Sequence, residues 1–385
     1  MDHPLSSFPR GTIFHITQHY FESLSVPPEE QLWLPDVEPV GEDDIKLAAR
    51  LINAFKAMSE YEQTHIAPKD RPNEGVWEMS KHEFHGDAYA LLHSEDVRGF
   101  AAYMVRACRE KLSHGLGMGE GVYTAVSSSP IAADHNAIIF KDRLALLAEA
   151  LGVLPFENPE QGRYGVNMNL PLGEIVAAIE RAVGYKIARR PVMGLFGLRH
   201  GENVIDGRTM DDVYCQTRLA ALNGRNIAEI GAGLGGIAHY AANNGASTYS
   251  LFDLPIICLV QGYFLAKLQG PDAVHLFGEP TDRRRISVLP YWEFFNRKRQ
   301  FDFVINRDSM AEIPRARVLD YLHEIKRRRI PFLSITQEVK AASGQIGITQ
   351  ISVPELAAQV GLRRSYRFIY WLRRGYIEEY YGSRT

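Results

Sequence analysis

Hydrophobic and polar positions change their spacing about halfway along the chain. In the first half, apolar residues recur every three or four positions, most clearly over residues 42–64, and this spacing predicts amphipathic helices. Three more helices are expected there: one capped by Ser94 and running to about residue 112, and two over residues 140–151 and 172–183. The segments between them, including residues 115–121 and the stretch that carries Asp134 and His135, are expected to be loops.

From about residue 203, short apolar runs alternate with helical patterns. Alternation of this kind predicts a parallel sheet with helices on both faces. The expected strands are residues 227–231, 249–253, 273–277, 301–306 and 332–336. The expected helices are residues 211–222, 236–243, 256–268, 315–328 and 354–360. Two final strand-like runs, residues 365–371 and 376–381, predict an antiparallel hairpin at the end of the sheet.

Length and composition limit the classes of protein that fit. The chain has 385 residues, which suggests two domains: a mainly helical region over residues 1–190 and an α/β domain over residues 191–385. It is 45% hydrophobic and 23% charged, as in ordinary globular proteins. Because the net charge is −3, no general attraction to nucleic acid or to an anionic membrane is expected.

The cysteines and the first residues favour a cytoplasmic protein. Cys108, Cys215 and Cys258 are widely separated and form no metal-binding spacing, as expected in a reducing compartment. The chain does not begin with a cationic segment followed by an apolar run, so we expect no signal peptide. Since no apolar run is long enough to span a bilayer, no membrane partner is expected either.

A glycine turn after the first strand is the strongest functional signal. Gly231, Gly233 and Gly236 satisfy the G-x-G-x-x-G pattern, and Asp253 ends the next strand 22 residues after Gly231. Such a turn lets a nucleoside-bearing ligand approach the backbone, and the acid can bind ribose hydroxyls. The pattern alone fits NAD as well, or a turn that only tightens the packing of strand and helix.

Glu229, two residues before the turn, favours S-adenosylmethionine over NAD. A carboxylate inside a strand needs a partner when it is buried. In an S-adenosylmethionine site it can accept hydrogen bonds from the amides of the glycine turn or from the methionine ammonium group. A dinucleotide would instead bring a diphosphate towards it.

Four segments of the second half resemble the bacterial sugar O-methyltransferases, a branch of the class I methyltransferase fold. They are Glu229-Ile-Gly-Ala-Gly-Leu-Gly-Gly236, Phe252-Asp-Leu-Pro255 with the following helix, residues 301–313, and residues 370–381. The resemblance covers the chain from about Pro191 onwards, and the Phe-Asp-Leu-Pro segment also occurs in O-methyltransferases of the aromatic type. It implies a Rossmann-like sheet, parallel with a C-terminal antiparallel hairpin.

The fold rule for doubly wound sheets gives each cofactor residue an expected role. Ligands bind outside the carboxyl ends of the strands, where Asn306 also lies. Asp253 would accept hydrogen bonds from both ribose hydroxyls, unless it caps the following helix. Leu254 and Leu289 are expected on the two sides of the adenine. Tyr214, on the helix before the first strand, is a further candidate for cofactor binding.

Methyl transfer to an alcohol requires a base for the hydroxyl proton. Asp308 and Glu312 follow the fourth expected strand and are four residues apart, so a helical turn would point both the same way. A simpler interpretation is that Asp308 caps the next helix and Glu312 faces solvent. His200 and His135 are alternative bases. A magnesium site made by Asp134, Glu279, Asp308 and Glu312 is possible, although their spacing does not indicate one.

Together these features predict a methyltransferase that uses S-adenosylmethionine and acts on a hydroxyl of a sugar or glycosylated metabolite. The helical first half is expected to cover the cleft, to select this small-molecule acceptor, and to mediate any homo-oligomer. Two alternatives remain. One is a methyltransferase for a polyketide, aromatic or peptide natural product, acting on O, N or C. The other is a non-catalytic subunit that binds S-adenosylmethionine.

Overall fold

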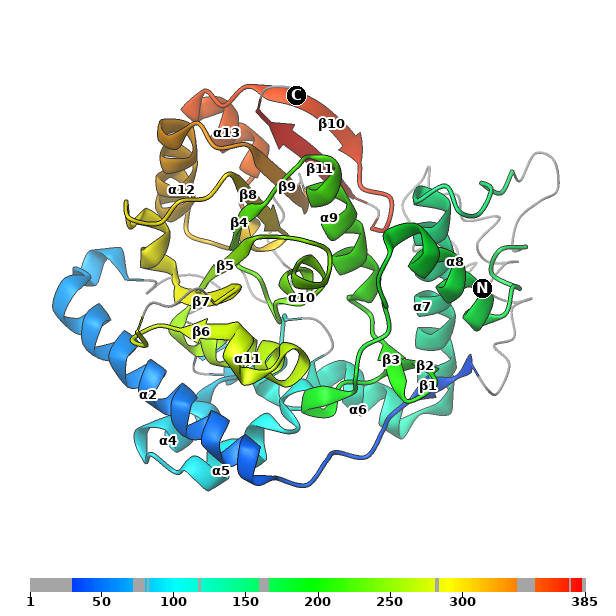
Figure 1. The fold of residues 1–385 in the computed structure, drawn as a ribbon, viewed down its shortest axis with the longest axis horizontal. Coiled ribbons are helices and arrows are strands. Elements are labelled where there is room, and N and C mark those ends of the chain that lie inside the picture. The colour runs from blue at the N-terminus through cyan, green and yellow to red at the C-terminus, as the bar shows by residue number, and fades with distance from the viewer. Residues whose placement is uncertain are drawn as a thin grey trace, which may run out of the picture.

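A mixed sheet of eight strands forms the centre of the protein (Figure 1). The computed structural model describes residues 30–71, 80–81, 83–116, 119–158, 166–280, 284–337, 350–373 and 375–382. The strand order is β10-β11-β9-β8-β4-β5-β7-β6. The strands are β4 (Asn226–Ile230), β5 (Thr248–Asp253), β6 (Val274–Leu276), β7 (Ile286–Pro290), β8 (Phe303–Arg307), β9 (Phe332–Gln337), β10 (Arg364–Ile369) and β11 (Tyr376–Tyr381).

The direction of the strands confirms the predicted α/β class. Strands β4 to β9 pair in parallel, whereas β11 is antiparallel to both β9 and β10. One strand was not expected: β7 lies between β5 and β6, so the predicted strand at residues 273–277 becomes the outer edge of the sheet. Apart from this extra strand, the sheet has the expected parallel strands and terminal antiparallel hairpin.

Helices cover both faces of the sheet, and alternate residues of each strand face opposite sides. On β4, Ile227 packs in the core with α9 (Thr209–Ala221), α10 (Gly236–Asn243) and α11 (Pro255–Gln269). Ala228 and Ile230 pack on the other face with α12 (Arg315–Arg328) and α13 (Val353–Val360). Glu229 therefore points towards the face that α9 and α10 cover.

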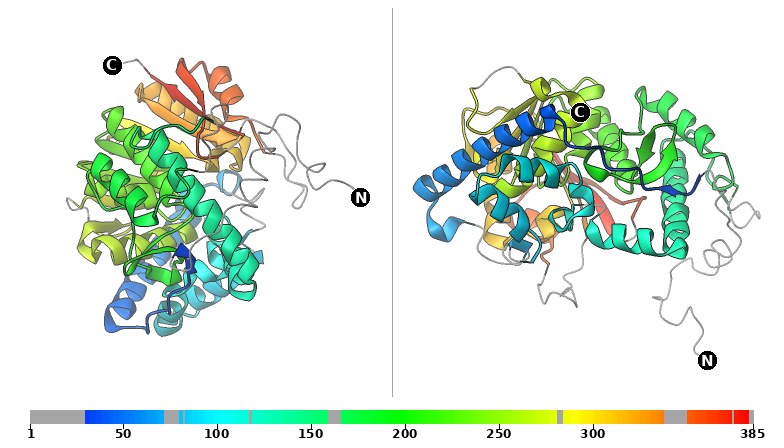
Figure 2. Two further views of the ribbon diagram at one scale, coloured as in Figure 1. Left: turned by 90° about the vertical axis from the view of Figure 1, so that its right-hand side faces the viewer. Right: turned by 90° about the horizontal axis from the view of Figure 1, so that it is seen from below.

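The helical first half packs directly on the sheet domain. Helix α2 (Glu42–His65) crosses α11, where the Asp44 carboxylate accepts hydrogen bonds from Tyr263 Oη at 2.6 Å and Lys267 Nζ at 2.8 Å. Figures 1 and 2 show α2 at one end of the molecule and α7 and α8 at the other. The remaining helices of this half are α4 (Gly86–His93), α5 (Val97–Met104), α6 (Glu120–Ser128), α7 (Pro130–Ala150) and α8 (Leu172–Val183).

A small antiparallel sheet, β1-β2-β3, joins the two halves of the chain. Its strands are β1 (Leu32–Trp33), β2 (Gly197–His200) and β3 (Asn203–Ile205), and the sequence pattern did not predict it. Beside it, Lys141 on α7 forms a buried ion pair with Glu30. None of the described helices combines the length and apolar character needed to cross a membrane.

Several short turns complete the chain. They are the 3-10 helices η3 (Pro68–Asp70), η4 (Ala107–Arg109), η5 (Lys111–Ser113), η7 (Val192–Gly194), η8 (Pro271–Ala273), η9 (Tyr291–Phe295) and η10 (Ser309–Ala311).

The first half contains two wrong predictions of helix position. Ser94 does not cap the helix, because its hydroxyl donates to Leu91 O in the preceding α4. Asp96 is the cap: its carboxylate accepts from Gly99 N at 2.9 Å, and the helix ends at Met104. The second error concerns α7, which begins at Pro130 with Ser129 as its cap, ten residues before the expected start.

Two expected loops therefore contain helix. Asp134 and His135 lie on α7, and residues 120–128 form α6. Gly117 and Met118, within the expected loop at residues 115–121, lie outside the described residues.

Candidate active site

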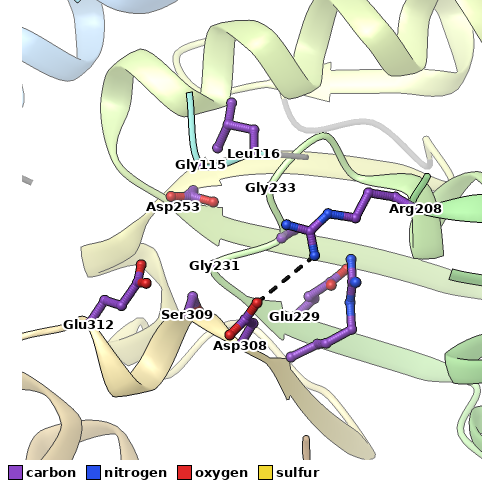
Figure 3. A pocket seen from close by; sticks show the side chains of 12 residues that line it. Gly115, Leu116, Arg208, Glu229, Gly231, Gly233, Asp253, Asp308, Ser309 and Glu312 are labelled. Carbon is purple, nitrogen blue, oxygen red and sulfur yellow. Dashed lines mark ion pairs between the residues drawn. The ribbon is translucent and has the colours of Figure 1, made fainter. Parts of the chain in front are cut away.

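A pocket of about 100 Å³ lies at the carboxyl ends of β4, β5 and β8 (Figure 3). This is the edge at which ligands of doubly wound sheets bind. Six of the expected site residues line it: Glu229, Gly231, Gly233, Asp253, Asp308 and Glu312. The other lining residues are Gly115, Leu116, Arg208, Ala232, Arg307 and Ser309.

The floor of the pocket is the glycine turn after β4, and its first glycine has two reasons to be glycine. Gly231 has a φ of 66°, in the left-handed region that side chains disfavour. A Cβ atom there would also lie 2.0 Å from Ser309 Oγ. The loop after β8 can therefore approach the turn closely, which brings Asp308 and Ser309 to the same pocket as Gly233.

Gly236 satisfies the sequence pattern but does not line the pocket. It is the first residue of α10, and a Cβ atom there would lie 1.9 Å from Asp212 Oδ2. Asp212 is buried and pairs with Arg189 on one side and with Arg307 on the other, the latter at 3.1 Å. The structure thus places Gly236 against a buried ion pair behind the pocket wall.

Glu229 is buried beside the glycine turn. Its carboxylate accepts a hydrogen bond from Tyr249 Oη at 2.7 Å, a donor that the sequence analysis did not anticipate. Burial raises the pKa of Glu229 to about 8, against the opposing effects of the Tyr249 hydrogen bond and the charge of Arg307. A cation that entered the pocket would favour the ionised form of this carboxylate.

Asp253 ends β5 with its carboxylate held by several donors. Leu254 N donates to Oδ1 at 2.8 Å, and Gln261 Nε2 on α11 donates to Oδ2 at 2.7 Å. Burial raises the pKa of Asp253 to about 7, although these hydrogen bonds oppose the rise. Leu254 is the N-cap residue of α11, and the helix has no side-chain cap hydrogen bond, so Asp253 does not cap it.

Asp308 and Glu312 lie on the opposite side of the glycine turn from Leu116 (Figure 3). The Asp308 carboxylate accepts hydrogen bonds from Tyr376 Oη at 2.8 Å and Arg373 Nη1 at 2.9 Å. It does not cap the turn that follows it. Burial and the charge of Asp308 raise the pKa of Glu312 to about 7. Of the two acids, Glu312 is therefore better suited to accept a proton near neutral pH.

Arg208 is a pocket residue that sequence reasoning missed. It precedes α9 and extends across the glycine turn towards Asp308, with 3.9 Å between Nη1 and Oδ2 (Figure 3). At that distance the ion pair lacks a direct hydrogen bond, and a quarter of the side chain is exposed. Burial and the nearby charge of Arg307 lower the pKa of Arg208. An arginine outside any strand or glycine motif gives no sequence signal for this role.

Leu116 belongs to the glycine-spaced segment 115–121, which the sequence analysis expected to be a loop. It comes from the first half of the chain and covers the turn, with its carbonyl oxygen 3.5 Å from where a Gly233 Cβ would stand. Only 7% of Leu116 is exposed, so it closes one side of the pocket. The first half of the chain therefore contributes Leu116 to the wall of the pocket.

Besides Gly236, four expected cofactor residues lie outside the pocket lining. Asn306 is fully buried and ties the loop after β8 to β4, because its amide donates to Ile230 O at 2.7 Å and Ser309 Oγ at 2.6 Å. Tyr214 donates to Glu378 at 2.7 Å, between α9 and β11. Leu289 is buried in the core beside the end of β5, where Leu254 begins α11.

Neither expected histidine lines the pocket. His200 ends β2 in the small sheet, and His135 is exposed on α7. The four acids considered for magnesium are not brought together either, since Glu279 pairs with Arg50 and Arg284 near the outer edge of the sheet. Among the described residues, no group of three or more His, Cys, Asp or Glu side chains is arranged to hold a metal ion.

No protein-family model matches the sequence, and no curated protein matches it. Several solved structures of methyltransferases are similar to part of the chain. The mitomycin 7-O-methyltransferase MmcR is 16% identical with a TM-score of 0.34, over 46% of this chain and 57% of that one. The glycopeptide N-methyltransferase MtfA, complexed with sinefungin, is 14% identical with a TM-score of 0.34, over 45% and 93%.

A third similar structure is the N-methyltransferase NodS from Bradyrhizobium japonicum WM9, in complex with S-adenosyl-L-homocysteine. It is 11% identical with a TM-score of 0.33, over 44% of this chain and 87% of that one. The chain spans somewhat more than half the length of MmcR. Each of these structures is similar to less than half of this chain, and the substrates in their names are those of the other proteins.

Proposed function

We propose that this chain is a methyltransferase that uses S-adenosylmethionine and methylates a hydroxyl of a sugar or glycosylated metabolite. The observation that carries the proposal is the combination of side chains in one pocket. A ribose-binding acid, Asp253, and a glycine turn lie beside Glu312, whose pKa near 7 suits a base.

The pocket residues fit the chemical groups of S-adenosylmethionine. Asp253 would accept hydrogen bonds from the ribose hydroxyls. Glu229 offers a buried carboxyl group for the ammonium group of the methionine, and this cation would favour its ionised form despite the raised pKa. Arg208 offers a planar guanidinium group that can bind the methionine carboxylate through two hydrogen bonds. NAD brings a diphosphate in place of an ammonium group and would not stabilise the ionised Glu229, which supports the same choice.

The volume of the pocket suggests how the cofactor would enter. Small-molecule sites usually measure about 300–1,000 Å³, whereas this pocket measures about 100 Å³. Since Leu116 covers the glycine turn, we expect Leu116 to shift when the cofactor binds. Once closed again, it would exclude water from the reacting groups.

The chain would contribute alignment and proton removal to the reaction. S-adenosylmethionine, when bound, supplies a methyl group activated by the positive sulfonium. Transfer of this methyl group to the acceptor oxygen would break the carbon–sulfur bond and leave its electron pair on sulfur. Glu312, in its ionised form, would take the hydroxyl proton. The products are a methyl ether and S-adenosylhomocysteine.

A sugar acceptor is supported by the two segments that surround Asp308 and Glu312, because both resemble segments of sugar O-methyltransferases. Residues 301–313 carry Asp308 and Glu312, and residues 370–381 carry Arg373 and Tyr376. These are two of the segments in which the sequence resembles sugar O-methyltransferases. In the structure they meet at Asp308, so the part of the chain that resembles the sugar branch is also the part next to the proposed base.

Calorimetric titration tests the cofactor assignment first. The purified protein should bind S-adenosylhomocysteine and not NAD. The variant Arg208→Gln should weaken binding of S-adenosylhomocysteine more than binding of 5′-methylthioadenosine, which lacks the amino-acid carboxylate. Binding of NAD alone would refute the proposal.

The acceptor class is tested by transfer of labelled methyl groups. Purified protein with methyl-labelled S-adenosylmethionine should label glycosides or nucleotide sugars at oxygen. Labelling only of aromatic or amine acceptors would overturn the sugar assignment while leaving the methyltransferase activity in place.

A further inference from the structure

The turn of the C-terminal hairpin contacts Asp308, one of the residues that line the pocket. Arg373 lies 65 residues after Asp308 in the chain and Tyr376 lies 68 residues after it, yet both donate hydrogen bonds to its carboxylate. The guanidinium group of Arg373 also stacks on the Tyr376 ring, with 4.0 Å between Cζ and the ring centroid. The two side chains therefore contact the carboxylate and each other.

The backbone of Asp308 is held as firmly as its side chain. Its φ is 75°, a value that non-glycine residues rarely adopt. The amide donates to Ile335 O at 2.7 Å, at the end of β9. Unusual backbone conformations of this kind persist only where surrounding contacts hold them, and they concentrate at functional sites. Here the contacts come from β9 and from the hairpin turn.

We propose that Arg373 and Tyr376 are positioning residues for methyl transfer, which fix the Asp308 carboxylate so that its charge acts on Glu312. The inference rests on the proposed function, because it takes Glu312 to be the base. Asp308 itself is already satisfied by two strong donors, so it is poorly placed to take a proton from the acceptor. Its contribution is a fixed negative charge.

The groups around Glu312 come from four different parts of the chain. Burial and the charge of Asp308 favour the protonated form of the Glu312 carboxyl, whereas Arg208 and Arg373 favour its ionised form. The side chain of Gln350 adds a hydrogen bond that also favours ionisation. Arg373 in the hairpin turn thus has two effects on Glu312. It holds Asp308, whose negative charge raises the pKa of Glu312, and its own positive charge lowers that pKa.

The titration of Glu312 itself tests this arrangement without needing the acceptor. Carbon-13 NMR of protein labelled at the glutamate carboxyl carbons would follow each carboxyl with pH, and Glu312→Gln would identify the relevant signal. We expect Arg373→Gln to raise the pKa of Glu312, on the order of half a pH unit, and Asp308→Asn to lower it. Tyr376→Phe removes a donor to Asp308 without removing a charge, so a less firmly held Asp308 should act less on Glu312 and the pKa of Glu312 should fall.

Two controls separate positioning from general damage to the fold. Arg364→Gln removes a charge from the same hairpin, where Arg364 pairs with Glu379, and should leave Glu312 unchanged. Arg373→Lys keeps the positive charge, so the pKa of Glu312 in this variant should stay close to the wild-type value. This variant can still be measured if Arg373→Gln does not fold.

The outcomes distinguish this inference from the proposed function. If Asp308→Asn does not lower the pKa of Glu312, or if Tyr376→Phe leaves that pKa unchanged, the positioning role is refuted. Binding of S-adenosylhomocysteine to the same samples tests the cofactor assignment separately, and a failure there would leave the titration result standing.

Discussion

The variant Asp253→Asn tests the ribose contact with almost no change in shape. The native carboxylate is already oriented by Leu254 N and by Gln261 Nε2, so it is held ready for a ligand. Asparagine keeps one acceptor oxygen but replaces the other with a donor group, and it loses the charge. We therefore expect the fold to be kept and the binding of nucleosides to be weakened.

The size of the effect follows from the number of hydrogen bonds. A hydrogen bond to a charged group contributes about 1.5–3 kcal/mol, and the ribose would donate two to Asp253. Because asparagine keeps one neutral acceptor, the expected loss is about 2–3 kcal/mol. At about 1.4 kcal/mol for each tenfold change, S-adenosylhomocysteine should bind about 30- to 150-fold more weakly.

The pH dependence provides an independent check. The pKa of Asp253 is raised to about 7, and the ribose hydroxyls favour the ionised carboxylate. Affinity of the wild-type protein should therefore increase with pH up to about 7, and Asp253→Asn should lose this part of the increase. Calorimetry at about pH 6 and about pH 8 measures both effects.

A matched control is Asp272→Asn, which removes the same charge from an exposed position. The control should bind like the wild type. If Asp253→Asn also bound S-adenosylhomocysteine like the wild type at both pH values, the ribose assignment would be wrong.

Three further variants follow from the pocket. Burial raises the pKa of Glu229 to about 8, so the folded protein keeps a proton that the unfolded chain releases. The free energy of unfolding should therefore fall as pH rises from about 4.5 towards 8. Thermal unfolding of Glu229→Gln should show a smaller fall over the same pH range. In Gly231→Ala the new Cβ meets Ser309 at positive φ, so urea denaturation should show about 1–3 kcal/mol more destabilisation than in Gly152→Ala, where the φ is also positive but the space is open. Glu312→Gln should bind S-adenosylhomocysteine normally and transfer methyl groups about 10²- to 10⁴-fold more slowly; unchanged turnover would exclude it as the base.

The sheet was largely predictable from the sequence because its strands are short apolar runs separated by helical patterns. β7 was missed as a strand, because the sequence analysis considered Leu289 only as a contact for the adenine. In the first half, the local signals were ambiguous. Ser94 and Asp96 are both good helix caps, and the structure uses Asp96, since Ser94 bonds back to the helix before it.

The pocket could be predicted only where its residues follow strands in the sequence. Asp253, Asp308 and Glu312 occur at strand ends, and the parallel sheet brings such positions together. Arg208 enters the pocket from a segment with no motif, and Leu116 enters it from a glycine-spaced loop whose sequence does not say where it packs. Their positions depend on how the first half packs over the sheet, which is tertiary information that no local motif carries.

The position of Gly236 has a consequence for genetics. Alanine at Gly231 and alanine at Gly236 should both weaken the protein, and in a screen the two defects would look alike. Their causes differ, because Gly231 makes room for Ser309, whereas Gly236 makes room for Asp212. Suppressor mutations should tell them apart. Ser309→Gly should relieve the clash caused by alanine at Gly231 but not the one at Gly236, where Asp212 cannot be removed without leaving Arg189 and Arg307 short of a buried partner. The glycine pattern therefore has two separate structural causes, the close approach of a loop at Gly231 and a buried ion pair at Gly236.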